Sequence, residues 1–255
     1  MSRIPEAFGR RKALIPYVTV GYPRPETALE LVPRLEEWGA DMVELGIPFS
    51  DPLADGATIQ EASFMALGQG TTPARCLEVA ARLRERVSLP LVFMTYYNPV
   101  LSYGLEGFCR EAARAGVDGL IIPDLPHEEG VELEAAGERH GVDLVYLLSP
   151  NSSAERMQAV GRHSRGFIYL VSLTGVTGAR RELPPELESF VGRVRQSATL
   201  PLAVGFGIST PEQTARAAEV ADGVIVGSRL IQLIREDDGY AAAGEFIRGL
   251  RRALG

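Results

Sequence analysis

Lysine is almost absent from this chain. Lys12 is the single lysine among 26 lysines and arginines, so nearly every basic side chain is an arginine. An enzyme that forms a Schiff base needs a lysine amine at its reacting centre. Any hypothesis of that kind therefore depends on where Lys12 lies.

Cysteine and histidine are also scarce. Cys76 and Cys109 fall in segments with helical patterns and lack the spacing of a metal site, which indicates reduced thiols and predicts a cytoplasmic protein. No two of the three histidines stand at helical ligand spacing. We therefore expect no metal site.

Long apolar runs and basic clusters are missing as well. No stretch approaches 18 consecutive apolar residues, and the N-terminus lacks the small-residue cleavage site of a signal peptide. A formal net charge of -7 argues against a nucleic-acid footprint. We expect neither a membrane nor a nucleic acid as partner.

Short β-branched runs alternate with amphipathic stretches along the whole chain. We expect strands over residues 14–20, 41–47, 89–96, 118–124, 143–149, 167–172, 200–207 and 222–228. Helical patterns separate them, which predicts right-handed βαβ units and a parallel sheet. Eight units without a linker favour an α/β fold with one (β/α)₈ TIM barrel, a single domain over residues 1–255; an open doubly wound sheet is the alternative.

Two local features accompany this pattern. The segments "GADMVE", "GVDGLI", "GVDLVY" and "VADGVI" each end a helix and begin a strand with an aspartate, which indicates internal repetition. Pro33 stands inside the first long helical pattern, where it should kink the helix or shift its start.

The stretch "ELGIPFSDPLADG" (44–56) places a glutamate inside an expected strand. Period-2 alternation puts Glu44 on one face with Met42 and Gly46, and both faces of the strand are apolar. A buried carboxyl group has a raised pKa and can exchange a proton near neutral pH. A structural carboxylate tied to a backbone group or an arginine is the alternative. Asp51 and Asp55 follow in turn-like dipeptides, which also occur without function.

Glycine-rich loops follow the last three expected strands. These loops are "TGVTGA" (174–179), "GFGIS" (205–209) and "VGSRLI" (226–231), the last of which opens a short helix. Backbone N–H groups in such loops bind oxyanions, and barrels often place phosphate sites after strands 7 and 8. Phosphate binding is favoured over glycines that serve tight turns alone.

Aromatic residues stand near several strand ends. Tyr17, Tyr96, Tyr169 and Phe206 are each more typical of core than of a ligand site. Together with the phosphate loops they indicate a substrate with an apolar ring at one end and a phosphate at the other.

The segment "VELGIPFSDPLADGATIQ" (43–60) closely resembles the signature of the tryptophan synthase α subunit family. The resemblance extends over nearly the whole chain. It includes, in the expected order, "PYVTVGYP" (16–23), "MTYYNPVLSYG" (94–104), "GLIIPDLPHEE" (119–129), "YLVSLTGVTGAR" (169–180) and "GFGISTPEQ" (205–213). The signature around Glu44 is specific, whereas many phosphate-binding barrels share the glycine loops.

The resemblance implies a lyase that cleaves indole-3-glycerol phosphate to indole and glyceraldehyde 3-phosphate by a retro-aldol reaction, in tryptophan biosynthesis. It implies that Glu44 and Asp55 are the catalytic residues, one protonating the indole ring and the other stabilising the charged ring nitrogen. The base that takes the glycerol hydroxyl proton stays open, and Glu44 is one candidate. No cofactor is implied for this chain.

The resemblance also assigns binding residues and a partner. It implies phosphate contacts by Gly178, Gly207, Gly227 and Ser228, a closing loop containing Thr177, and an indole pocket of Tyr17, Tyr96, Ile121, Leu147, Tyr169 and Phe206. It implies a hetero-tetramer of two α and two β subunits, in which the pyridoxal-phosphate-dependent β subunit receives the indole. Two departures stand out: Tyr17 replaces a common phenylalanine, and "SLTGVTGARRE" differs from the usual closing loop.

Rival functions fit the residues less well. A Schiff-base aldolase would need its lysine at the barrel mouth, whereas Lys12 precedes the first strand. A metal-dependent aldolase or epimerase lacks suitably placed histidines. A barrel that only binds a ligand and regulates a partner remains a different class, although both acids are present.

Overall fold

The computed structural model describes residues 2–9, 11–171, 186–205 and 207–255. In this part of the chain the strands are all parallel and form one sheet. They are β1 (Ala13–Thr19), β2 (Val43–Gly46), β3 (Leu91–Met94), β4 (Gly119–Ile121), β5 (Asp143–Val145), β6 (Leu147–Leu148), β7 (Ile168–Val171), β8 (Leu202–Gly205) and β9 (Gly223–Val226).

The strand order β5-β4-β3-β2-β1-β9-β8-β7-β6 closes the sheet into a barrel. The two ends of this order, β5 and β6, are consecutive pieces of one strand that is interrupted at Tyr146. The backbone N–H of Tyr146 donates to Ser164 Oγ at 3.0 Å, which accounts for the interruption. The predicted eight-stranded barrel is therefore confirmed, and the open-sheet alternative is wrong.

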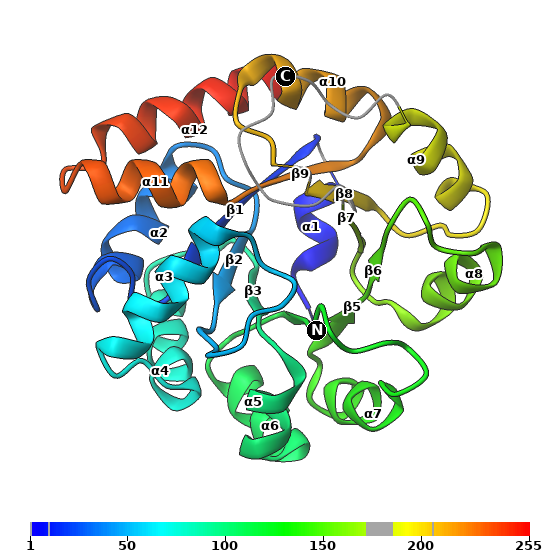
Figure 1. The fold of residues 1–255 in the computed structure, drawn as a ribbon, viewed down its shortest axis with the longest axis horizontal. Coiled ribbons are helices and arrows are strands. Elements are labelled where there is room, and N and C mark those ends of the chain that lie inside the picture. The colour runs from blue at the N-terminus through cyan, green and yellow to red at the C-terminus, as the bar shows by residue number, and fades with distance from the viewer. Residues whose placement is uncertain (1, 10, 172–185, 206) are drawn as a thin grey trace.

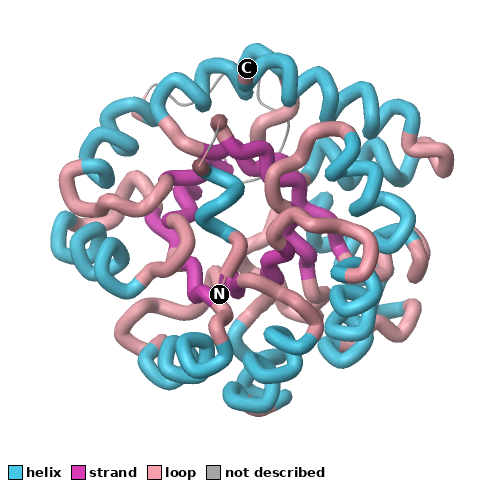
Figure 2. Tube along the Cα trace, turned by 180° about the vertical axis from the view of Figure 1, so that it is seen from behind, coloured by secondary structure: helices cyan, strands magenta, loops and turns pink. Residues whose placement is uncertain are grey.

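Helices surround the ring of strands (Figure 1). They are α1 (Ile4–Phe8), α2 (Thr27–Glu37), α3 (Ala57–Gly68), α4 (Pro73–Arg84), α5 (Tyr97–Tyr103), α6 (Leu105–Arg114), α7 (Val131–His140), α8 (Ala154–His163), α9 (Leu187–Arg195), α10 (Pro211–Val220), α11 (Ser228–Glu236) and α12 (Ala241–Leu254). Helix α1 is the exception, because it lies within the ring of strands when the barrel is seen from behind (Figure 2).

Alternating side chains separate two apolar layers. Val43 and Leu45 of β2 join the layer between strands and helices. Met42, just before β2, joins an inner layer with one or two residues from each of the other long strands. Ile4 and Ala7 of α1 close this inner layer at one end. The predicted alternation is confirmed, and it directs Glu44 into the barrel interior.

Pro33 lies inside α2 and does not shift the start of the helix, so that part of the expectation from sequence is wrong. Helix α2 continues through it from Thr27 to Glu37. Proline lacks the N–H that would bond the carbonyl four residues earlier, which is that of Leu29. The guanidinium of Arg86 donates to this carbonyl oxygen instead, so the helix retains a satisfied backbone.

The repeated strand-opening aspartates have a shared role at the end of the barrel where strands begin. Asp41, Asp118 and Asp222 each accept a hydrogen bond from the backbone N–H that opens the preceding strand, at 2.9, 3.0 and 2.9 Å. Asp143 instead bonds the side chain of Ser2. Three of the four repeats therefore tie neighbouring strands together.

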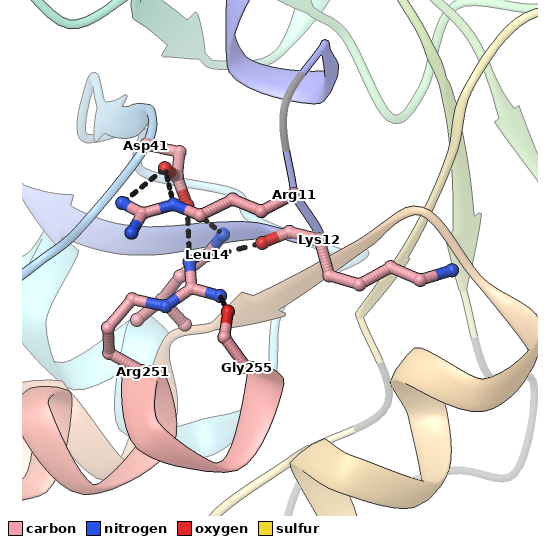
Figure 3. A network of polar contacts seen from close by, with 6 residues as sticks. All are labelled: Arg11, Lys12, Leu14, Asp41, Arg251 and Gly255. Atoms are coloured by element: carbon pink, nitrogen blue, oxygen red, sulfur yellow. Dashed lines mark hydrogen bonds and ion pairs between the residues drawn. The ribbon is translucent and has the colours of Figure 1, made fainter.

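Asp41 also organises the chain ends (Figure 3). Its carboxylate accepts from Arg11 Nε at 2.9 Å and from Arg251 Nη1 at 2.7 Å, and Arg251 also donates to the carbonyl oxygens of Lys12 and Gly255. The side chains of Asp41 and Arg251 are only 12% and 11% exposed. This network joins the N-terminal segment, β2 and the last helix.

Candidate active site

Glu44 faces the barrel interior from β2, between Tyr17 of β1 and Val92 of β3 in the strand register. Its side chain is completely buried, and neither carboxyl oxygen has a hydrogen-bond partner among the described residues. Burial raises the pKa of Glu44 to about 8. Glu44 is therefore protonated at neutral pH and able to act as an acid, and the alternative of a tied structural carboxylate is wrong for the described part of the chain.

Asp55 lies in the loop after β2 and is partly buried. The loop is held by Tyr96, whose hydroxyl oxygen accepts a hydrogen bond from the Ala54 backbone N–H at 2.8 Å. The ring of Phe49 stacks on the same tyrosine, with 5.3 Å between ring centroids. Burial raises the pKa of Asp55 to about 6, against a hydrogen bond from the Tyr96 hydroxyl that lowers it.

The two acids therefore differ in protonation state near pH 7. Glu44 keeps its proton, whereas Asp55 is mostly ionised. Neighbouring titratable groups whose pKa values are pushed apart mark acid and base roles. Asp51 does not share this environment: it is exposed, and its carboxylate accepts from the adjacent Ser50 hydroxyl.

The aromatic residues expected near the strand ends are buried at the mouth. Tyr17, Tyr96 and Tyr169 are 5%, 5% and 7% exposed, and burial is the main cause that raises the pKa of each above its ordinary range. They remain neutral phenols. Ile121 and Leu147 join Tyr169 in the inner layer, while Phe206 lies outside the described residues.

The glycine loops after the last two strands lie next to each other, because β8 pairs with β9. Gly207 has a φ of +68°, which favours glycine, and Gly227 precedes Ser228 at the start of α11. The first turn of a helix offers free backbone N–H groups to an anion. Gly178 and Thr177 lie outside the described residues.

The groups required by the rival functions lie elsewhere. Lys12 is at the opposite end of the barrel, where its Nζ donates to the Ala221 carbonyl at 2.7 Å. Across the described ranges, no cluster of three or more His, Cys, Asp or Glu side chains is arranged to hold a metal ion.

Nor does any helix in those ranges have the length and apolar character to cross a membrane.

The sequence did not point to Thr19 or Gly46 as functional candidates, and it indicated Gly205 only as part of a phosphate loop. Thr19 is fully buried two residues beyond Tyr17, and its Oγ1 donates to the Tyr17 hydroxyl at 3.3 Å. Gly46 and Gly205 leave room for tyrosines, since an added Cβ would lie 2.1 Å from the Tyr17 hydroxyl or 2.5 Å from that of Tyr169. Period-2 spacing from Tyr17 and Glu44 would have pointed to Thr19 and Gly46.

Fold and site together define a class of protein. The chain is a (β/α)₈ barrel enzyme with a buried carboxylic acid on β2 and a second, ionised carboxylate in the loop that follows the same strand. Active sites of such barrels lie at this end.

Comparison with known proteins identifies the family. The profile of the tryptophan synthase alpha chain matches residues 7–247. The alpha chain of Dehalococcoides mccartyi is 58% identical over 254 residues, covering 100% of both chains. The crystal structure of tryptophan synthase subunit alpha from Legionella pneumophila is 40% identical, with a TM-score of 0.92 over 100% of this chain and 98% of that one. A structure of Mycobacterium tuberculosis tryptophan synthase is 38% identical, with a TM-score of 0.93 over 99% and 98% of the chains.

The chain belongs to the tryptophan synthase alpha chain family. It is accordingly a lyase of tryptophan biosynthesis that acts on indole-3-glycerol phosphate.

Proposed function

We propose that Glu44 and Asp55 carry out the cleavage by general acid and electrostatic catalysis. The observation that supports this most is the burial of Glu44 without a hydrogen-bond partner among the described residues. A protonated acid held in an apolar interior is suited to give its proton to a carbon atom of an apolar ring.

The reaction begins when Glu44 protonates C3 of the indole ring, which places positive charge on the ring nitrogen. The Asp55 carboxylate stabilises that charge. A base then takes the proton of the glycerol hydroxyl, its oxygen becomes the aldehyde carbonyl, and the electrons of the breaking carbon–carbon bond return to the ring. Indole and glyceraldehyde 3-phosphate result. The Glu44 carboxylate left by the first transfer is one candidate for this base.

We further propose that the substrate's two ends are bound separately. Tyr17, Tyr96, Ile121, Leu147, Tyr169 and Phe206 would surround the indole ring. Gly178, Gly207, Gly227 and Ser228 would bind the phosphate, and Thr177 would belong to the loop that closes over it. The positive φ of Gly207 and the helix that starts at Ser228 support the phosphate end.

The test compares two isosteric variants with the wild type. Glu44→Gln should reduce indole release by about two to four powers of ten, because it removes the proton donor. Asp55→Asn should also cripple cleavage, since it removes the anion. Binding of glycerol phosphate should persist in both variants. If Glu44→Gln keeps most of the wild-type turnover, the proposed acid is wrong.

We also propose a complex with the pyridoxal-phosphate-dependent β subunit, as a hetero-tetramer of two α and two β subunits. Apolar side chains around the mouth support this: Leu53 is 94% exposed, Phe64 78% and Leu101 51%. Phe49, Pro52 and Phe64 line a groove of about 580 Å³ beside the loop that carries Asp55. Exposed apolar patches with a charged rim are typical of protein interfaces.

Docking on this surface would order the loop of Asp55, so we expect the β subunit to accelerate cleavage at least several-fold. Asp51→Lys should reduce this gain while basal turnover persists. Glu138→Lys makes the same change of charge on the half of α7 that runs away from the mouth, and it should leave the gain intact. Titration that shows neither complex formation nor a change in turnover would refute the proposal.

The chain itself is proposed to need no cofactor and to work in the cytoplasm. Its one lysine lies at the far end of the barrel, away from any carbonyl chemistry at the mouth. Both cysteines are buried, unpaired thiols, which suits a reducing compartment.

A further inference from the structure

Tyr17 and Glu44 are neighbours in the barrel wall. They are register partners on the paired strands β1 and β2, and parallel register directs both side chains into the interior. Both are buried, with Tyr17 5% exposed and Glu44 fully enclosed. A phenol and a carboxyl group therefore share one small region of the site.

Gly46 determines where the tip of Tyr17 lies. A Cβ at position 46 would be 2.1 Å from the Tyr17 hydroxyl oxygen and 2.5 Å from the ring carbon that bears it. The hydroxyl therefore occupies the space that any other residue at 46 would fill. Since Gly46 is two residues beyond Glu44, this space lies on the same face of β2 and toward the mouth.

Among the described residues the Tyr17 hydroxyl donates to no acceptor and neither Glu44 oxygen has a partner, so the two groups make no hydrogen bond while Glu44 is protonated. Thr19 Oγ1 donates to the Tyr17 oxygen at 3.3 Å, which leaves the phenol's own hydrogen free to be given to another group. Burial, with the charges of Asp55 and Glu44, raises the pKa of Tyr17, so the phenol stays protonated and remains a donor.

We propose that Tyr17 is a positioning residue for Glu44. When Glu44 gives up its proton and becomes a carboxylate, the Tyr17 hydroxyl, oriented by Thr19, donates a hydrogen bond to it. The inference rests on the proposed function of Glu44. While Glu44 is protonated it needs no donor. Once ionised it is a buried charge, and a fixed neutral donor offsets part of the cost of that burial.

The test is Tyr17→Phe, which removes one oxygen atom and keeps the ring. We expect kcat to fall about tenfold with KM nearly unchanged, the loss typical of a hydrogen bond to a charged group. Loss of a donor to the ionised form also raises the pKa of Glu44. The alkaline limb of the pH profile should therefore move up by about one unit, which a purely packing role would not produce.

Three further variants test whether the donor to Glu44 is the Tyr17 hydroxyl, another tyrosine hydroxyl or neither. Thr19→Val keeps the phenol but removes its tether, and should shift the alkaline limb in the same direction by less. Tyr146→Phe removes another buried tyrosine hydroxyl, which donates to Glu134 of α7 at 2.6 Å, and should leave the limb unmoved. If Tyr169→Phe shifts the limb and Tyr17→Phe does not, the donor is Tyr169 and the inference is overturned.

A double variant distinguishes this inference from the proposed function itself. Tyr17→Phe should have no further effect on residual turnover in a Glu44→Gln background, because the hydroxyl acts through Glu44. Wild-type turnover in Glu44→Gln would refute the function. A crippled Glu44→Gln together with a wild-type pH profile for Tyr17→Phe would refute the inference alone.

Discussion

The hydroxyl oxygen of Tyr96, just beyond β3, accepts a hydrogen bond from the backbone N–H of Ala54, 42 residues earlier in the chain, at 2.8 Å. Ala54 precedes Asp55, so one buried tyrosine holds the segment that carries the second acid. The same hydroxyl also bonds the Asp55 carboxylate, which lowers the pKa of Asp55 against the larger effect of burial.

Tyr96→Phe should therefore reduce turnover several-fold and change its pH dependence. In the proposed mechanism, turnover requires ionised Asp55 and protonated Glu44, whose pKa values of about 6 and about 8 would bound the active range. Removal of the hydroxyl raises the pKa of Asp55, so turnover at pH 6 should fall more than turnover at pH 7.5. Tyr103→Phe, at a half-exposed tyrosine on α5, is the control. An acid limb that stays at the wild-type pH would contradict the assignment.

Glu44→Gln should stabilise the protein against unfolding as pH rises. Because the folded-state pKa of about 8 exceeds the ordinary value of 4.5, the wild type loses stability between these two pH values as its unfolded chain releases the proton first. The amide cannot ionise and escapes this loss, which is on the order of a few kcal/mol.

Thermal melts of the two proteins at pH 5 and pH 8.5 measure this effect. The melting temperature of the variant should exceed that of the wild type by more at pH 8.5 than at pH 5. Glu245→Gln, at an exposed glutamate of α12, should show no such trend. A difference that is constant with pH would contradict the raised pKa of Glu44.

Gly207→Val should weaken the phosphate end of the site selectively. It adds bulk where backbone N–H groups must approach oxygen, and it strains a residue at a φ of +68°. Competition by glycerol phosphate should fall more than competition by an indole analogue. Gly70→Val introduces the same strain at a φ of +78°, with no atom within 4 Å of the added Cβ, and should spare both affinities. Equal losses for the two competitors would count against this phosphate site.

Arg251→Met should lower stability without altering the chemistry. It removes the donor at 2.7 Å from the nearly buried Asp41 and keeps the length of the side chain. Hydrogen bonds to charged groups contribute about 1.5–3 kcal/mol to the free energy of unfolding. Arg235→Met, which breaks an exposed pair with Glu61, should cost less than about 1 kcal/mol. Denaturant titration compares the two, and equal losses would show that the Asp41 network is no stronger than a surface pair.

Much of this architecture could be predicted from local pattern. Alternation placed Glu44 on one face of its strand with Met42, and the period of strands and helices predicted the closed sheet, but only the structure shows that this face is the barrel interior. Helix α3 could not be predicted from periodicity, because its apolar residues do not gather on one face and Phe64 is exposed. The interruption at Tyr146 depends on a hydroxyl group 18 residues away, which no local pattern reveals.

In the site, too, some features could be predicted from sequence order, whereas others depend on contacts between residues distant in the chain. Sequence order places Asp55 and Tyr96 after neighbouring strands, but the bond from Ala54 to Tyr96 depends on the path of a loop in three dimensions. The clearance between Gly46 and Tyr17 likewise exists only once two strands are in register. Thr177, Gly178 and Phe206 lie outside the described residues, so their assignments stay predictions.

Helix α1 gives the barrel a floor. Ile4 and Ala7 fill the inner layer from below, and the ring of Phe8 packs on Phe167 with 5.5 Å between centroids. Because α1 closes one end of the barrel, substrate and products must enter and leave by the open end, where the strands finish. In the proposed complex, indole released near Glu44 would leave through this open end, past the exposed side chains of Leu53 and Phe64, where we propose that the β subunit binds. The five-residue helix α1 would thus determine from which end of the barrel indole leaves.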